Sequence, residues 1–232
     1  MICLCFILVK PEKNECIKAR CSRHGPEIRF PFRLTGIQPQ HCGYSQSFDL
    51  SCTKENKTLL QLPTSANFYV NKIDYKSQII HISDPDACLP RLIRNVNLSS
   101  SPFRYAYDEI MADYDVFSCA SETDIDLFYA TVLPSCINGS DHKLYAVRSW
   151  LSIDEVTLIS CSKMYKLVSI PSDGLLKGEN KILLSWSTPN CYECEAKGNK
   201  CRLNSNSTEP EIECHRIKST KGIASDLNLY NL

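Results

Sequence analysis

The chain has 232 residues, 26 Lys and Arg against 26 Asp and Glu, and a hydrophobic content of 43%. The length predicts one large or two small domains, the apolar content argues against global disorder, and the balanced charge offers no polybasic surface for nucleic acid. Eight glycines and twelve prolines exclude collagen-like and low-complexity classes, whereas fourteen cysteines predict disulfides that supplement a hydrophobic core.

The first nine residues form an apolar run that contains Cys3 and Cys5. The run fits the apolar region of a signal peptide in length, although it lacks a basic start and a small-residue cleavage site; a short buried strand is the alternative. We interpret residues 1–15 as the remnant of a leader. The remaining twelve cysteines are an even number and can pair completely, in a connectivity that spacing leaves open. They are Cys16, Cys21, Cys42, Cys52, Cys88, Cys119, Cys136, Cys161, Cys191, Cys194, Cys201 and Cys214.

The chain from residue 16 to about residue 120 has the texture of strands and turns, without helical periodicity. Alternating or β-rich runs predict strands at residues 48–52, 58–62, 68–75, 79–82 and 114–119. The third and fourth of these read as a hairpin, and Asp84-Pro-Asp86 then forms a turn.

A polar, acidic stretch at residues 121–126 marks a boundary, after which a second module runs from 127 to 214 and a polar tail from 215 to 232. Residues 142–149 and 164–170 predict strands, whereas residues 153–159 fit either a short helix or a strand. The expected fold class is therefore mostly β: a disulfide-rich extracellular ectodomain of two modules with little helix.

Four acceptor patterns for N-glycosylation occur, at Asn56, Asn97, Asn138 and Asn206. Together with twelve pairable cysteines they indicate an oxidising, extracytoplasmic compartment. No segment after the first nine residues reaches the eighteen apolar residues that a spanning helix needs. The chain as given is expected to be soluble, with any membrane anchor outside these residues.

The N-terminal module carries a string of spaced landmarks: Cys16-x4-Cys21, Gly25-Pro-Glu-Ile-Arg-Phe-Pro-Phe32, His41-Cys-Gly43, Phe48-Asp-Leu-Ser-Cys52 and the hairpin. Over residues 16–120 this string resembles the galacturonan-binding extracellular domain of plant wall-associated receptor kinases. The Cys21-to-Phe32 stretch is most similar to ectodomains of membrane-anchored RING-type ubiquitin ligases. The resemblance implies a polysaccharide-binding domain for pectin, displayed at the cell surface by a single-pass membrane protein.

The C-terminal module carries Leu184-Ser-Trp186, Cys191-Tyr-Glu-Cys194, Gly198-Asn-Lys-Cys201 and Cys214. It resembles the cysteine-rich C-terminal module of the same family, with that family's Gly-Gly-x-Cys pattern reduced. The resemblance leaves two parents open, one with a RING and one with a kinase following the ectodomain.

A binder of polygalacturonate, which is a polyanion, needs cationic donors, and Arg forks suit carboxylates best. The candidate ligand-binding residues are Arg20, Arg23, His24, Arg29 and Arg33, in a segment with one acid, Glu27. If residues 28–32 form a strand, Arg29 points outward while Phe30 and Phe32 pack in the core. The alternative for each cation is an ordinary solvated surface residue.

The other chemistries considered have weaker support. Cys191, Cys194, Cys201 and Cys214-His215 could ligate zinc, but the compartment favours disulfides. No carboxylate pair, nucleophile elbow or histidine cluster indicates catalysis, so the chain is expected to be a binding module with no metal, no cofactor and no enzyme activity. The alternative function is recognition of a protein or peptide by the sensing half of a ubiquitin ligase or receptor-like kinase.

Overall fold

The computed structural model describes residues 16–63, 66–94, 96–106, 111–120, 130–137, 141–151, 158, 160–171, 180–204 and 211–216. Within these residues strands dominate and the two α-helices have five residues each, which confirms the expected mostly β fold with little helix. The strands are β1 (Arg33–Leu34), β2 (Asp49–Cys52), β3 (Thr58–Gln61), β4 (Asn67–Asp74), β5 (Ile79–Ser83), β6 (Phe103–Tyr105), β7 (Met111–Ala120), β8 (Ala130–Val132), β9 (His142–Arg148), β10 (Ser162–Pro171), β11 (Ile182–Trp186), β12 (Lys200–Leu203) and β13 (Ile212–His215). The helices are α1 (Leu89–Ile93) and α3 (Tyr192–Ala196), with 3-10 turns η1 (Gln40–Cys42), η2 (Gln46–Phe48) and η3 (Ser135–Ile137).

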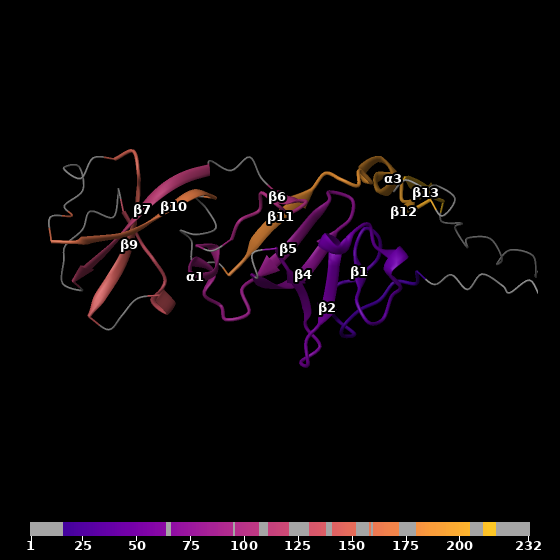
Figure 1. The fold of residues 1–232 in the computed structure, drawn as a ribbon, viewed down its shortest axis with the longest axis horizontal. Coiled ribbons are helices and arrows are strands. Elements are labelled where there is room, and N and C mark those ends of the chain that lie inside the picture. The colour runs from indigo at the N-terminus through magenta and orange to yellow at the C-terminus, as the bar shows by residue number, and fades with distance from the viewer. Residues whose placement is uncertain are drawn as a thin grey trace, which may run out of the picture.

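The larger sheet has seven strands in the order β1-β2-β3-β4-β5-β11-β6. β1 and β2 pair in parallel, and the other neighbours are antiparallel. The predicted hairpin is confirmed as β4 and β5, and β11 inserts beside β5 although it lies far along the chain (Figure 1). The predicted strands at 48–52 and 58–62 are confirmed as β2 and β3.

The main core lies against one face of this sheet, because alternate residues of each strand are apolar and point the same way. Ile80 and Ile82 of β5 are fully buried, and Leu184 of β11 is 1% exposed. Phe32, directly before β1, packs against residues of the strands at the other edge of the sheet. Its ring lies 5.1 Å from that of Trp186 in β11, edge to face, and stacks 6.2 Å from that of Phe103 in β6. The expected burial of Phe30 and Phe32 is confirmed.

The second sheet, in the order β10-β7-β9-β8, forms the opposite end of the molecule (Figure 1). It contains the predicted strands at 114–119, 142–149 and 164–170. The two sheets do not follow the expected division at residues 120–127, because β7 lies in the second sheet and β11 in the first. Sheet membership alone does not define domains, so the division into two modules stays a prediction.

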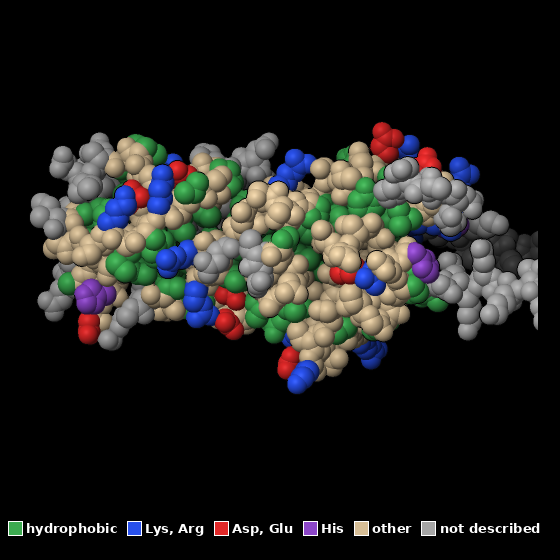
Figure 2. Space-filling view, viewed as in Figure 1, with side chains coloured by type: hydrophobic (Ala, Val, Ile, Leu, Met, Phe, Trp, Pro, Cys, Tyr) green, Lys and Arg blue, Asp and Glu red, His purple; other side chains and the backbone are tan. Residues whose placement is uncertain are grey.

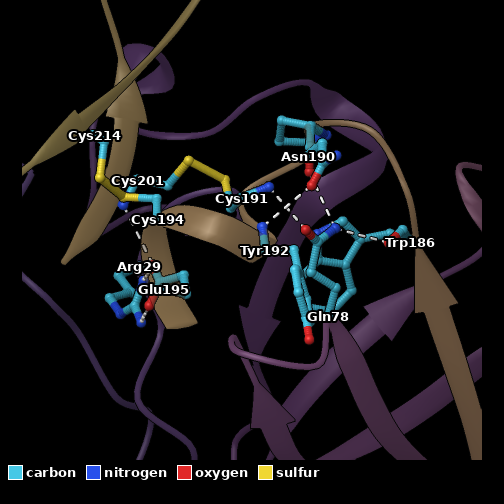
Figure 3. Close-up of a disulfide and its surroundings, with 11 residues drawn as sticks. Arg29, Gln78, Trp186, Asn190, Cys191, Tyr192, Cys194, Glu195, Cys201 and Cys214 are labelled. Atoms are coloured by element: carbon cyan, nitrogen blue, oxygen red, sulfur yellow. Dashed lines mark hydrogen bonds and ion pairs between the residues drawn. A yellow bond between two sulfur atoms is a disulfide. The ribbon is translucent and has the colours of Figure 1, made fainter. Parts of the chain in front are cut away.

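All twelve predicted cysteines are paired, in six disulfides. Cys16–Cys42 and Cys21–Cys52 brace the N-terminal segment, Cys88–Cys136 joins the start of α1 to η3, and Cys119–Cys161 joins β7 to the residue before β10. Cys191–Cys201 and Cys194–Cys214 hold α3 against the β12–β13 ribbon (Figure 3). The four cysteines considered as zinc ligands are thus disulfide-bonded, not thiolates.

The strand at residues 28–32, which was the condition for an outward-pointing Arg29, does not form. Residues 28–32 contain a single bridge, Ile28 to Ala19, and then turn through a cis Phe30–Pro31 peptide. Pro31 has no N–H to donate to a ladder, and its carbonyl accepts a hydrogen bond from the Tyr44 N–H at 2.9 Å. The strand begins only at Arg33.

Several expectations fall on residues outside the described ranges: the leader remnant with Cys3 and Cys5, the boundary at 121–126, most of 153–159, the acceptors Asn138 and Asn206, and the tail from residue 217. Asn56 and Asn97 are described, and both are exposed in turn or loop segments. Among the described residues no helix has the length and apolar character needed to cross a membrane.

Candidate functional site

The five predicted ligand-binding residues do not form one open cationic surface. Arg29 makes a two-pronged ion pair with Glu195 of α3, with Nη1–Oε1 at 2.6 Å and Nη2–Oε2 at 2.8 Å (Figure 3). The side chains are 14% and 5% exposed, so Arg29 does not point outward as it would from a strand over residues 28–32. The reason is the turn at Pro31, which breaks the strand alternation on which that expectation depended.

Tyr75, directly after β4, holds the same segment. The Arg29 guanidinium lies 3.7 Å from the centre of the Tyr75 ring, a cation–π contact. The Tyr75 hydroxyl donates to the Glu27 carbonyl at 2.8 Å and accepts from the Arg29 N–H at 3.0 Å. Burial raises the pKa of Tyr75, so the hydroxyl stays protonated and can donate. Arg29 is therefore engaged on both sides.

Arg33 is engaged as well. It faces Asp49 across the parallel β1–β2 pair, and its Nε lies 2.6 Å from Asp49 Oδ1, with a second bond from Nη2 to Oδ2. Both side chains are less than a quarter exposed. A polyanion would have to displace Asp49 to reach this guanidinium.

The other predicted cations are exposed, and the fold adds two more to them. Lys18 and Arg20 both bind Glu27 Oε2, at 2.8 and 3.1 Å, while Arg23 and His24 are exposed with no ion-pair partner in the described part of the chain. Lys200 of β12 also acts on Glu27. We call Lys18, Arg20, Arg23, His24 and Lys200 the basic rim.

Electrostatics at Glu27 reflect this excess of positive charge. Partial burial raises the pKa of Glu27, but the hydrogen bond and charge of Lys18, with the charges of Lys200 and Arg20, outweigh it and hold the pKa below its ordinary 4.5. One carboxylate faces three cations, so the rim keeps a net positive charge. The sequence did not indicate Lys200, because it reaches the rim only through the fold of the C-terminal disulfide-bonded unit.

A second candidate site lies on the larger sheet. Asn71, His81, Ser83, Asn180 and Lys181 line a pocket of ≈ 340 Å³, which falls within the range of about 300–1,000 Å³ usual for small-molecule sites. Its lining is polar and basic. Burial, then the charges of Lys181 and Lys72, lower the pKa of His81 below its ordinary 6.5, against the opposing effect of Asp74. The sequence carries no signal for this site, because its residues lie far apart along the chain, form no motif and are brought together only by strand pairing.

The face of the molecule in Figure 2 shows no broad surface of one charge: Lys and Arg are scattered over both ends, and several lie beside Asp or Glu. Cys16, His41 and Cys42 are the one metal-type cluster within the described ranges, and the two sulfurs are bonded to each other. The described residues thus offer recognition chemistry: cationic donors, amides and a hydroxyl on a disulfide-braced β scaffold.

Comparison with known proteins agrees with a recognition domain. Residues 16–84 match the sequence model of the family described as wall-associated receptor kinase galacturonan-binding. The resemblance drawn from the cysteine spacing and the Phe30-Pro-Phe32 and Cys42-Gly43 landmarks is therefore confirmed. The matched range covers β1 to β5 and most of the basic rim.

Among curated relatives, the RING-H2 finger protein ATL22 of Arabidopsis thaliana is 29% identical over 90% of this chain and 55% of its own length. The RING-H2 finger protein ATL20 of the same plant is 30% identical over 59% of this chain and 48% of its own. The rust resistance kinase Lr10 of Triticum aestivum is 24% identical over 82% and 36% respectively. The chain thus spans about half the length of the RING-H2 relatives it matches. No solved structure gives a significant match.

Proposed function

We propose that the chain is an extracellular domain of a plant cell-surface protein and binds galacturonan, the acidic polysaccharide of pectin. The observation that carries the proposal is the match of residues 16–84 to the galacturonan-binding family, in a chain braced by six disulfides. Disulfides persist in oxidising compartments such as the cell exterior. The acceptor sites Asn56 and Asn97, both exposed, fit the same compartment.

The basic rim is the proposed contact surface for the polymer. Polygalacturonate carries one carboxylate on each sugar, so a group of solvent-accessible cations can bind several of them at once. Arg20 and Arg23 supply planar guanidinium forks that match carboxylates, while Lys18, His24 and Lys200 add charge. Of the five residues named from the sequence, Arg29 and Arg33 act instead as structural ion pairs that hold the segment in place.

The proposal also covers the longer protein of which this chain would be the extracellular part. The relatives are RING-H2 finger proteins and receptor-like kinases, and this chain matches only part of each. We propose that the domain senses a wall ligand for a ubiquitin ligase of the RING type, with a kinase parent as the alternative. The family match is to a binding domain, so catalysis would belong to segments beyond this one.

The first prediction concerns charge. The disulfide-bonded protein should bind an oligogalacturonate by isothermal titration calorimetry but not the fully methyl-esterified oligomer of the same length. Affinity should fall as salt rises from 0.01 to 0.15 M, because the Debye length shrinks from about 30 to about 8 Å. Equal binding of the esterified oligomer would mean that carboxylates are not recognised.

The rim is tested by the triple variant Arg20→Ala/Arg23→Ala/Lys200→Ala, which should weaken binding about tenfold, since exposed ion pairs contribute up to about 1 kcal/mol each. The matched control, Lys54→Ala/Lys57→Ala/Lys143→Ala, removes the same charge from exposed positions elsewhere. If both triples weaken binding equally, net charge and not the rim is responsible. A glycan array run beside a pull-down of wall proteins separates this function from recognition of a protein or peptide.

A further inference from the structure

The pocket on the larger sheet has no role in the contacts described so far. We propose that this pocket, lined by Asn71, His81, Ser83, Asn180 and Lys181, is a second binding site that holds a single acidic sugar unit through its carboxylate and hydroxyl groups. The site is distinct from the basic rim and comes from three segments, β4, β5 and the two residues before β11.

Strand alternation places the pocket on the face opposite the core. Ile80 and Ile82 of β5 are completely buried, so the residues between and after them, His81 and Ser83, point to the other side. Leu183 of β11 is the cross-strand partner of His81, and Lys181 precedes it by two residues on the same face. Tyr69 of β4 pairs with Ser83, so its half-buried ring lies on this face beside the pocket.

A β-bulge supplies Asn71. The β4–β5 register runs from Val70–Ile82 directly to Lys72–His81, which leaves Asn71 without a partner. Bulges redirect a side chain out of the regular alternation and are common beside functional sites. Here the bulge presents an exposed amide at the wall of the pocket, where it can both donate to and accept from sugar hydroxyls.

One of the residues that line the pocket is held by the backbone, whereas the side chains of the other four can bind a ligand. The Asn180 amide is held by the Asp84 backbone, accepting from its N–H at 3.0 Å and donating to its carbonyl at 2.9 Å. By contrast, the side chains of Asn71, His81, Ser83 and Lys181 have no hydrogen-bond or ion-pair partner within the described ranges. A ligand can therefore bind these four groups without breaking an existing bond.

The charge of the surroundings selects an anion. Lys181 lines the pocket, and Lys72 and Lys181 both act on His81; neither lysine has an ion-pair partner in the described part of the chain. The acid that also acts on His81 is Asp74, whose Oδ1 accepts the backbone N–H groups of Lys76 and Ser77. A carboxylate suits the lysine and imidazole, while hydroxyls suit the amide and the Ser83 hydroxyl. The choice of a uronic acid over other hydroxy acids rests on the proposed function; the pocket itself does not.

Titration of the disulfide-bonded protein with galacturonic acid and trigalacturonate, followed by NMR of the His81 ring and the Asn71 side-chain amide, tests the site. Both sets of resonances should shift with trigalacturonate and with galacturonic acid, and not with galactose or the methyl ester. Lys181→Gln should weaken galacturonate binding about fivefold to tenfold, as loss of one partly exposed charge-assisted contact. The matched control is Lys143→Gln, an exposed lysine of the other sheet.

Binding should also depend on pH between 5 and 7, where a sugar carboxylate stays ionised. The pKa of His81 is low in the free protein, and a bound carboxylate favours the imidazolium, so affinity should rise as pH falls through the pKa of the complex toward that of the free protein. The charged groups that act on His81 are Lys181, Lys72 and Asp74. Burial raises the pKa of Asp74, but hydrogen bonds from Ser77 and Lys76 outweigh it and hold that pKa below its ordinary value, so the carboxylate stays ionised in this range. His81→Asn should bind with pH-independent affinity.

The outcomes separate this inference from the proposed function. If oligogalacturonate binds but the His81 and Asn71 resonances and the Lys181→Gln affinity do not change, the pocket is not a sugar site and the function stands. If the pocket responds to galacturonic acid while the polymer does not bind, the proposed function falls and the pocket stands. Equal response to galactose would overturn the acidic specificity.

Discussion

Arg29 joins the N-terminal segment to the C-terminal disulfide-bonded unit through an ion pair that is almost closed to solvent. Both carboxylate oxygens of Glu195 accept from the guanidinium, and Oε1 also accepts the Cys201 N–H at 3.3 Å. The Tyr75 ring covers the guanidinium. A pair of this kind contributes little compared with an apolar substitute of the same shape, but removal of one partner leaves a buried, uncompensated charge.

Arg29→Ala should therefore lower the free energy of unfolding by about 3–5 kcal/mol, measured by guanidinium denaturation with the disulfides intact. Arg91→Ala is the matched control, because Arg91 pairs with Asp86 at 2.8 Å but both side chains are more than half exposed. Its cost should stay within about 1 kcal/mol. A similar loss of unfolding free energy in the two variants would show that the Arg29–Glu195 pair does not stabilise the fold more than an exposed pair does.

The glycine of the Cys42-Gly43 landmark is required by a contact between single residues. A Cβ added to Gly43 would lie 2.9 Å from Cγ of Arg33, too close without a shift, and 3.1 Å from its Cδ, a tight contact. The glycine lets the Arg33 stem pass over the backbone on its way to Asp49. The landmark could be read from the sequence, but this reason could not, because it depends on which side chain crosses the glycine.

At the scale of elements, the β4–β5 hairpin clamps the chain where it leaves β11. Gln78 ends the hairpin turn with a positive φ of 54° and is 5% exposed. Its amide donates to the carbonyls of Trp186 and Pro189, at 2.8 and 3.2 Å, and accepts the Cys191 N–H at 2.8 Å (Figure 3). A single buried side chain thus sets the path from the large sheet into the C-terminal disulfide-bonded unit.

Gln78→Ala should destabilise the protein by about 2 kcal/mol or more, because it leaves buried backbone groups without partners. It should also speed hydrogen exchange at the Cys191 amide, which loses its acceptor. Gln61→Ala is the control, since Gln61 is exposed on β3. Unchanged exchange at Cys191 in the Gln78 variant would contradict the clamp.

Elements were easier to predict from the sequence than their arrangement. Alternation over residues 48–52, 58–62, 68–75 and 79–82 located β2 to β5 because each has one buried face. The five-residue α1, which begins at Leu89, was missed because it is too short for a helical period. The candidate site was predicted only in part: proximity in sequence grouped five cations, but Arg33 and Arg29 have partners 16 and 166 residues away.

At the scale of the whole molecule, the larger sheet is completed by segments far from its first five strands. β11 adds to β5, β6 adds to β11, and their residues Trp186 and Phe103 cover Phe32. No local pattern could place β11, because its position depends on this packing and on the Gln78 clamp. The family match at residues 16–84 therefore covers the part with the landmarks but not the complete sheet.

A fragment of residues 16–84 should consequently fail to fold, although it keeps β1 to β5 and both of its disulfides, Cys16–Cys42 and Cys21–Cys52. Without Trp186, Leu184 and Phe103 it would expose apolar surface worth about 25 cal/mol per Å², and β5 would become an open edge. Its ¹H–¹⁵N spectrum should be poorly dispersed and its thermal unfolding non-cooperative, whereas residues 16–216 should give a dispersed spectrum and a sharp transition. A well-dispersed spectrum from the fragment would mean that the matched region is a domain in its own right. The fragment lacks Asn180 and Lys181 of the pocket on the larger sheet. Titration of the folded fragment with galacturonan would then tell whether the matched region binds the polymer without that pocket.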